Sequence, residues 1–169
     1  MTVGTHEQQF NRLVREVDRL RGEKLIEEKV VIQTGFSTYE PVFCEWSRLY
    51  PYQQMLQYVA EARIVITHGG PSSFIMPLQQ GKVPIVVPRQ KGYGEHVNDH
   101  QVEFCRAVAT RRKNIIVIEE IGELWNAIHM YGMSSPEAVT EMEGNNQKFL
   151  DEFKRIVKGL RINTTNKGR

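Results

Sequence analysis

The chain has 169 residues, of which 40% are hydrophobic and 25% are charged, and its formal net charge is +2. This length predicts one globular domain, and so small a net charge argues against nucleic acid as the main partner. No apolar stretch approaches the roughly 20 residues that span a bilayer, and the first seven residues lack the pattern of a signal peptide. The isolated Cys44 and Cys105 are typical of reduced thiols in a cytoplasmic protein.

Strand-like and helix-like segments alternate through the first half of the chain. Thr2 and Val3 form the stub of a first strand. Because a strand usually has about 5–6 residues, either this strand is short or residues upstream of Met1 extend it. The further elements expected are a helix with its apolar face over 10–20, a strand over 29–33, a candidate third strand at Val42–Cys44, and a helix that Pro51 opens and that runs to 60.

The alternation continues in the second half. The pattern predicts strands over 64–67, 84–87 and 114–118, and helices over 72–80, from Asn98 or Asp99 to about 111, and over 121–130. A loop is expected over 133–137. A last helix follows, with apolar residues on one face at Phe149, Leu150, Phe153, Ile156, Val157 and Leu160, and the polar tail from Arg161 is expected to be disordered.

Strands and helices that alternate at this spacing predict an α/β fold with a doubly wound, mostly parallel sheet. Ligands of such sheets bind outside the carboxyl ends of the strands. That rule brings four loops to one edge, at Gly4–Glu7, Thr34–Glu40, His68–Ser73 and Arg89–Asn98. Three of the four are rich in Gly, Thr, Ser or His, which favours a nucleotide-type ligand.

The sequence His68-Gly69-Gly70-Pro71-Ser72-Ser73 joins a β-branched strand to a helix. The N–H groups in the first turn of a helix lack partners within the helix, and the helix dipole places partial positive charge there. The turn therefore indicates an anion site. The plainer alternative is a tight turn with a capped helix and nothing bound.

A metal site is not predicted. His96 and His100 lie four residues apart on an expected helix start and could share a metal, but zinc needs further ligands that the spacing does not supply. The chain also contains no Asp-x-Asp pair whose carboxylates could hold a metal. Surface histidines or contacts to a ligand are the simpler interpretations.

Three motifs occur in order: Thr-Val-Gly-Thr-His-Glu-Gln at 2–8, His-Gly-Gly-Pro at 68–71, and the run from Val87 to Gln101. Together they resemble the C-terminal, donor-binding domain of glycosyltransferase family 28, over residues 1 to about 160. The similarity is greatest to the stand-alone catalytic subunits of two-component transferases that extend lipid-diphosphate-linked sugars in bacterial exopolysaccharide and capsule synthesis. The resemblance implies a Rossmann-like C-terminal half of a GT-B enzyme over 1–160, with 161–169 as the polar tail.

The resemblance also implies the donor site. The first loop and Ser72 and Ser73 should meet the donor diphosphate, Arg89 or Lys91 could add positive charge, and the segment from Glu95 should hold the sugar hydroxyls. One position departs from the family pattern, because Met76 stands where a glutamate binds the ribose. The donor-binding residues expected in this way are Gly4, Thr5, His68, Gly69, Gly70, Pro71, Ser72, Ser73, Arg89, Glu95, His96, His100 and Gln101.

By the same resemblance, the reaction is expected to be inverting transfer of a hexose from a UDP-sugar to a lipid-diphosphate-linked sugar, without a metal or other cofactor. Galactose is the favoured hexose, with glucose and N-acetylglucosamine left open. The candidates for the general base are His6 and Glu7, or a group of the partner. A membrane-associated acceptor-binding subunit would complete the cleft and hold the chain at the inner face of the membrane. The last helix either docks that partner or packs on its own sheet. The alternative function is a non-catalytic donor-binding or regulatory subunit.

Overall fold

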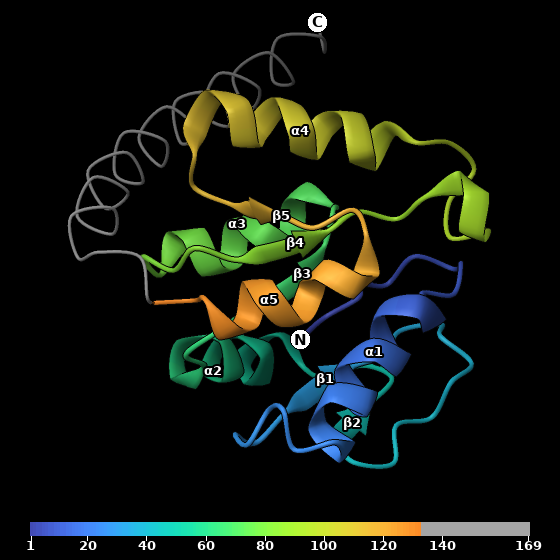
Figure 1. Cartoon of the computed structure of the whole chain (residues 1–169), viewed down its shortest axis with the longest axis vertical. Helices are drawn as coiled ribbons and strands as arrows, with labels where there is room; N and C mark the ends of the chain where they lie inside the picture. Colours follow the sequence, from blue (N-terminus) through green and yellow to red (C-terminus); the bar gives the residue numbers. More distant parts are fainter. Residues whose placement is uncertain (133–169) are drawn as a thin grey trace, which may run out of the picture.

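The computed structural model describes residues 1–132, which form a parallel sheet between layers of helices (Figure 1). The strands are β1 (Val31–Gln33), β2 (Glu45–Ser47), β3 (Ile66–His68), β4 (Ile85–Val87) and β5 (Ile116–Val117). β1 pairs with β2, and β4 lies between β3 and β5. Thr2 forms parallel bridges to Gln33 and to Thr67, and so joins the two groups of strands. The strand order is therefore β2, β1, Thr2, β3, β4, β5.

Helices cover both faces of this sheet, as the sequence predicts. They are α1 (Asn11–Gly22), α2 (Tyr52–Glu61), α3 (Pro71–Gln79), α4 (His100–Arg112) and α5 (Leu124–His129), with short 3-10 turns at Lys91–Tyr93 and Ile121–Glu123. Ile85 and Val87 pack in one apolar cluster with residues of α1 and α5, whereas Val86 packs in a second cluster with Phe74 of α3 and Cys105 of α4. Successive side chains of a strand point to opposite faces, so the buried run of β4 supplies both clusters.

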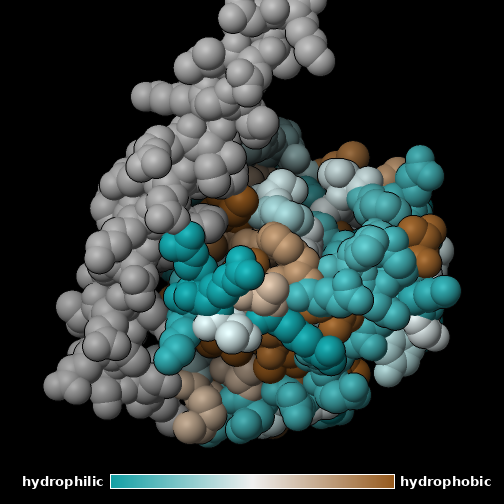
Figure 2. All heavy atoms as spheres, turned by 90° about the horizontal axis from the view of Figure 1, so that it is seen from above, coloured by the Kyte–Doolittle hydropathy of each residue, from teal (hydrophilic) through white to brown (hydrophobic). Residues whose placement is uncertain are grey.

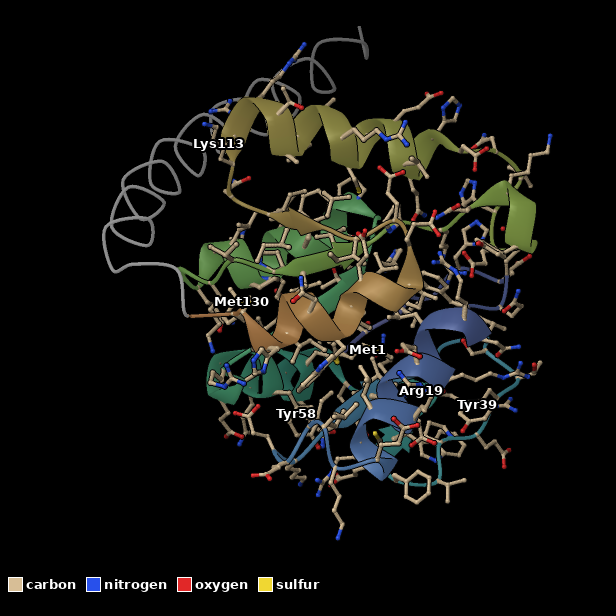
Figure 3. The ribbon with its side chains drawn as sticks, viewed as in Figure 1. Met1, Arg19, Tyr39, Tyr58, Lys113 and Met130 are labelled. Carbon is tan, nitrogen blue, oxygen red and sulfur yellow. The ribbon has the colours of Figure 1, made fainter. Side chains whose placement is uncertain are left out.

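The third strand lies later in the chain than the sequence suggests. Val42–Cys44 was expected as a strand, and that prediction is wrong, because the strand is β2 at Glu45–Ser47. The backbone N–H groups of all three residues donate instead to the carboxylate of the buried Asp18, at 2.8–3.1 Å. Tyr39, which lies beside α1 in Figure 3, donates its hydroxyl to the same carboxylate at 2.8 Å.

The start of α4 agrees with the sequence, which predicts a cap at Asn98 or Asp99. Asp99 stands at the N-cap position, but its side chain accepts a hydrogen bond from Lys91 N at 2.8 Å and does not cap the helix. Asn98 Oδ1 accepts from His100 N at 3.2 Å. Asp99 therefore ties the β4–α4 loop to the helix start.

Hydrophilic side chains cover much of the described surface on the α4 side, with smaller apolar patches between them (Figure 2). Within residues 1–132, no helix has the length and apolar character needed to cross a bilayer. The expected loop at 133–137, the last helix and the tail from 161 lie outside the described residues.

Candidate functional site

The strand order changes direction at the strand stub of Thr2. The chain leaves Thr2 for β1 on one side and returns to β3 on the other, so the loops after Thr2 and after β3 diverge. Ligands of open α/β sheets bind at such a switch point. A cleft of about 760 Å³ opens there, lined by Thr2, Gly4, Thr5, His6, Glu7, Gln33, Tyr50, Tyr52, Met55, Val59, His68, Ser72, Ser73 and Met76.

His68 is packed between two glycines at the floor of this cleft. A Cβ atom added to Gly4 would lie 2.4 Å from His68 Cε1, and one added to Gly70 would lie 2.3 Å from His68 Nε2. Gly4 also has φ +75°, a backbone conformation that residues other than glycine rarely adopt. Both glycines are therefore required by the position of the imidazole ring.

The imidazole of His68 is neutral in the structure. Its pKa is lowered to about 3, mainly by burial, with smaller contributions from the positive charge of Arg89 and from His6 and His96. The side chain is 7% exposed, and its Nδ1 is buried with no hydrogen-bond partner among the described residues. His68 thus offers the cleft an uncharged ring with unused hydrogen-bonding capacity.

The N-terminus of α3 opens on the same cleft. Gly70 is the N-cap residue, Pro71 is the first helical residue, and no side chain caps the helix. Ser72 is exposed and Ser73 is partly exposed, and both line the cleft. An uncapped helix start with two hydroxyl groups is suited to bind an anion, because the N–H of Ser72 and the helix dipole favour negative charge, whereas the N–H of Ser73 already donates to Gly70 O at 3.0 Å.

The structure brings the two candidate bases to the rim. His6 and Glu7 are exposed residues of the first loop and line the cleft. The ring of His6 lies against the ring of His96 from the β4–α4 loop, with centroids 5.2 Å apart. His100 is exposed at the start of α4, where its Nδ1 lies 3.6 Å from Glu103. His96 therefore joins the first loop, whereas His100 does not line the cleft.

Arg89 and Glu95 were expected to contact the donor, but both side chains are completely buried. The guanidinium of Arg89 donates to backbone carbonyl oxygens, and the carboxylate of Glu95 accepts from Arg12 at 2.9 and 3.0 Å and from Gln90 N at 3.0 Å. These groups are occupied within the protein. They shape the loops around the cleft and do not form its surface.

Gln101 has a similar internal role. Its Oε1 accepts a hydrogen bond from Arg89 N at 3.1 Å. A Cβ atom added to Gly69 would lie 3.0 Å from that same oxygen and 3.0 Å from Cys105 Sγ. Gly69 is therefore the contact by which α4 packs on the turn after β3, and Gln101 links that turn to the end of β4.

One wall of the cleft was not predicted from the sequence. Tyr50 of the β2–α2 connection and Tyr52 and Met55 of α2 give this wall an apolar and aromatic surface. Tyr52 is 64% exposed. The available signal was their place, directly after the carboxyl end of a strand, but the strand itself was predicted too early in the chain.

Among residues 1–132, no group of three or more His, Cys, Asp or Glu side chains is arranged to hold a metal ion. His6, His68 and His96 come near one another, but the ring of His68 is wedged between Gly4 and Gly70. The cleft combines a helix N-terminus, hydroxyl groups, imidazoles and an aromatic wall. This combination suits a ligand with an anionic part and a flat apolar part.

The fold and the cleft at its switch point define a Rossmann-like, nucleotide-binding type of α/β domain. The family model of the glycosyltransferase family 28 C-terminal domain matches residues 1–158. The chain belongs to this family, and its domain is the Rossmann-like half of a GT-B glycosyltransferase. A search among curated proteins found no relative.

Proposed function

We propose that this chain is the donor-binding catalytic subunit of an inverting glycosyltransferase, which transfers a hexose from a UDP-sugar to a lipid-diphosphate-linked sugar. The observation that carries the proposal is the joining of the α3 N-terminus and an aromatic wall in one cleft at the switch point. Membership of a glycosyltransferase family supports it. The resemblance of the motifs at 2–8 and 87–101 to exopolysaccharide and capsule transferases favours galactose as the hexose.

The diphosphate of the donor would bind at the start of α3. Negative charge builds on the diphosphate as its bond to the sugar breaks, so hydrogen-bond donors fixed at that position stabilise the transition state. Ser72 supplies a hydroxyl and a first-turn N–H group there, and Ser73 supplies a hydroxyl. This stabilisation comes from fixed protein dipoles, and we therefore propose a metal-independent reaction.

The nucleoside would lie on the opposite side of the cleft. Tyr50, Tyr52 and Met55 offer a flat base an apolar wall. Met76, on the same helix as Ser73, also lines the cleft, and it has no oxygen to accept hydrogen bonds from ribose hydroxyls. The ribose would accordingly be held through the main chain or by water.

The acceptor hydroxyl must lose a proton during transfer, and the first loop offers His6 and Glu7 for this role. Both are exposed at the rim, where an acceptor would enter. The sugar would lie toward His96, which contacts His6. An exposed base at the mouth of an open cleft needs a second wall to exclude water.

That second wall would come from a membrane-associated, acceptor-binding subunit on the cytoplasmic side. Loops at the carboxyl edge of the sheet expose large apolar side chains around the cleft. They are Phe36, Leu49, Tyr52, Tyr93 and Val97, each between 52% and 67% exposed. Apolar side chains gathered at one edge are typical of a protein interaction site.

A calorimetric titration tests the donor site. The purified chain is titrated with UDP, UDP-galactose, UDP-glucose and UDP-N-acetylglucosamine, and so are Ser73→Ala and the control Thr110→Ala. Thr110 carries an exposed hydroxyl on α4 that bonds only to Arg106 O among the contacts described. Saturable binding that prefers UDP-galactose and weakens in Ser73→Ala alone supports the proposal. Equal binding by all three proteins, or no binding, contradicts it.

Met76 favours a second candidate, a non-catalytic donor-binding subunit, because a missing ribose contact would loosen the donor pose. The two functions differ in turnover. Transfer from labelled UDP-galactose to a lipid-diphosphate-linked sugar, in the presence of the co-expressed acceptor-binding subunit, supports a catalytic subunit. Binding of UDP without transfer under those conditions supports the second candidate.

A further inference from the structure

Arg89 lies at the carboxyl end of β4, with its side chain completely buried. Its Nη2 donates to the backbone oxygen of Val3 at 2.9 Å. Its Nη1 donates to the backbone oxygens of Gln8 and Gln9, both at 2.9 Å. The guanidinium therefore binds the backbone on both sides of the first loop, at Val3 before it and at Gln8 and Gln9 after it.

The same guanidinium also holds the loop on its own side of the sheet. Nη1 also donates a hydrogen bond to the backbone oxygen of Glu95, at 3.3 Å. The carbon of the guanidinium lies 4.8 Å from the centre of the Phe10 ring, directly after the first loop. One planar group thus connects the first loop to the β4–α4 loop, which carries His96.

Arg89 remains charged at neutral pH although burial lowers its pKa to about 10. Burying a charged group is costly unless it is hydrogen-bonded; backbone oxygens accept from both Nη atoms of this one, whereas its buried Nε has no partner among the described residues. Arginine suits the position because its rigid fork directs several N–H groups at once, whereas lysine presents a single point charge.

We propose that Arg89 is a positioning residue for glycosyl transfer: its buried guanidinium holds the first loop in the shape that presents His6 and Glu7 to the cleft. The inference rests on the proposed function for the identity of the ligand. Arg89 touches neither donor nor acceptor in this account, and it acts through the backbone of residues 3–9.

The test compares Arg89→Lys with Arg12→Lys. Arg12 lies in the same region and is also an arginine with several internal hydrogen bonds. It donates to Glu95 and to the backbone oxygens of Pro88 and Glu119, and not to the first loop. We expect Arg89→Lys to speed hydrogen–deuterium exchange of residues 4–9 and to weaken UDP binding about tenfold or more, since small misplacements in a site are costly. Saturating UDP should restore the slow exchange.

In Arg12→Lys, the exchange of residues 4–9 and the UDP affinity should stay within about twofold of the wild type. A general loss of stability would affect both variants, so it would not explain a change in Arg89→Lys alone. Wild-type exchange and affinity in Arg89→Lys, or equal changes in both variants, overturn the inference. If wild-type protein binds no UDP, the proposed function fails, and the exchange of unliganded residues 4–9 still decides whether Arg89 holds the loop.

A measurement on the wild-type protein covers the case in which Arg89→Lys does not fold. With ¹⁵N-labelled arginine, the Nη–H resonances of Arg89 should be protected from solvent and should shift on saturation with UDP. Those of Arg12 should shift less. Arg89 resonances that exchange freely, or that do not respond to bound UDP, overturn the inference.

Discussion

Gly70→Ala is expected to damage the cleft, because a new methyl group would collide with His68. The added Cβ would lie 2.3 Å from His68 Nε2 and 3.0 Å from Cδ2. Favourable contacts between such atoms begin near 3.5 Å, so the ring or the helix start must move by roughly 1 Å. The ring has no room to retreat, since the main chain of Gly4 lies against its other side.

The cost of this substitution is purely steric. Gly70 has φ −75° and ψ 130°, a conformation that alanine adopts without strain. Overpacking of a buried site typically costs about 1–3 kcal/mol. If the donor diphosphate binds at the α3 N-terminus beside His68, the same displacement weakens UDP binding by roughly 5- to 150-fold.

Calorimetry with UDP and urea denaturation measure the two effects. Gly92→Ala is the matched control, because nothing lies within 4 Å of a Cβ added at that position. The control should bind UDP and unfold like the wild type. A Gly70→Ala protein with wild-type stability and wild-type UDP affinity would refute the claim that His68 and the α3 start form one rigid unit.

Three further predictions concern titration and reactivity. Because the folded pKa of His68 is about 3, below the value near 6.5 of an unfolded histidine, its Cε1–H resonance should not move between pH 8 and 5; a midpoint above pH 5 contradicts the burial argument. Burial raises the pKa of Asp18, but hydrogen bonds from Val42, Phe43 and Tyr39 outweigh it and leave the pKa below its usual value. Asp18 therefore contributes stability above about pH 4 that is lost as the pH falls through its folded pKa, and Asp18→Asn should flatten the free energy of unfolding over that acid range. Burial raises the pKa of both Cys44 and Cys105 to about 12, so neither thiol should react with Ellman's reagent at pH 8 unless the protein is unfolded.

The sheet and most helices could be predicted because their signal is local. The β-branched runs that became β1, β3 and β4 are short, buried on both faces and bounded by loops with Gly or Pro. Pro51 and Pro71 lie at the starts of α2 and α3, where proline is favoured.

The error at Val42–Cys44 has a non-local cause. These residues have strand-like side chains, but Asp18, more than 20 positions earlier, takes their backbone N–H groups. These N–H groups are therefore bonded to a carboxylate on α1 and do not donate to a neighbouring strand. Such competition depends on the packing of α1 against the loop, which the local pattern does not contain.

Only part of the candidate site could be predicted, because some of its contacts also join residues far apart in the sequence. The switch-point rule leads from the strand order to the loops at Gly4–Glu7 and His68–Ser73, which line or shape the cleft. Charge alone does not tell a ligand contact from an internal one, and Arg89 and Glu95 have internal partners from 80 to 86 residues away in the sequence or in adjacent loops. The aromatic wall at Tyr50 and Tyr52 depends on where β2 ends.

The most direct test of the central claim is a crystal structure of the chain soaked with UDP. The account predicts diphosphate density within hydrogen-bonding distance of the Ser72 N–H and of the Ser72 and Ser73 hydroxyls at the start of α3, with the uracil against Tyr50 or Tyr52. UDP bound elsewhere on the chain, or bound in this cleft with its diphosphate away from α3, would contradict it.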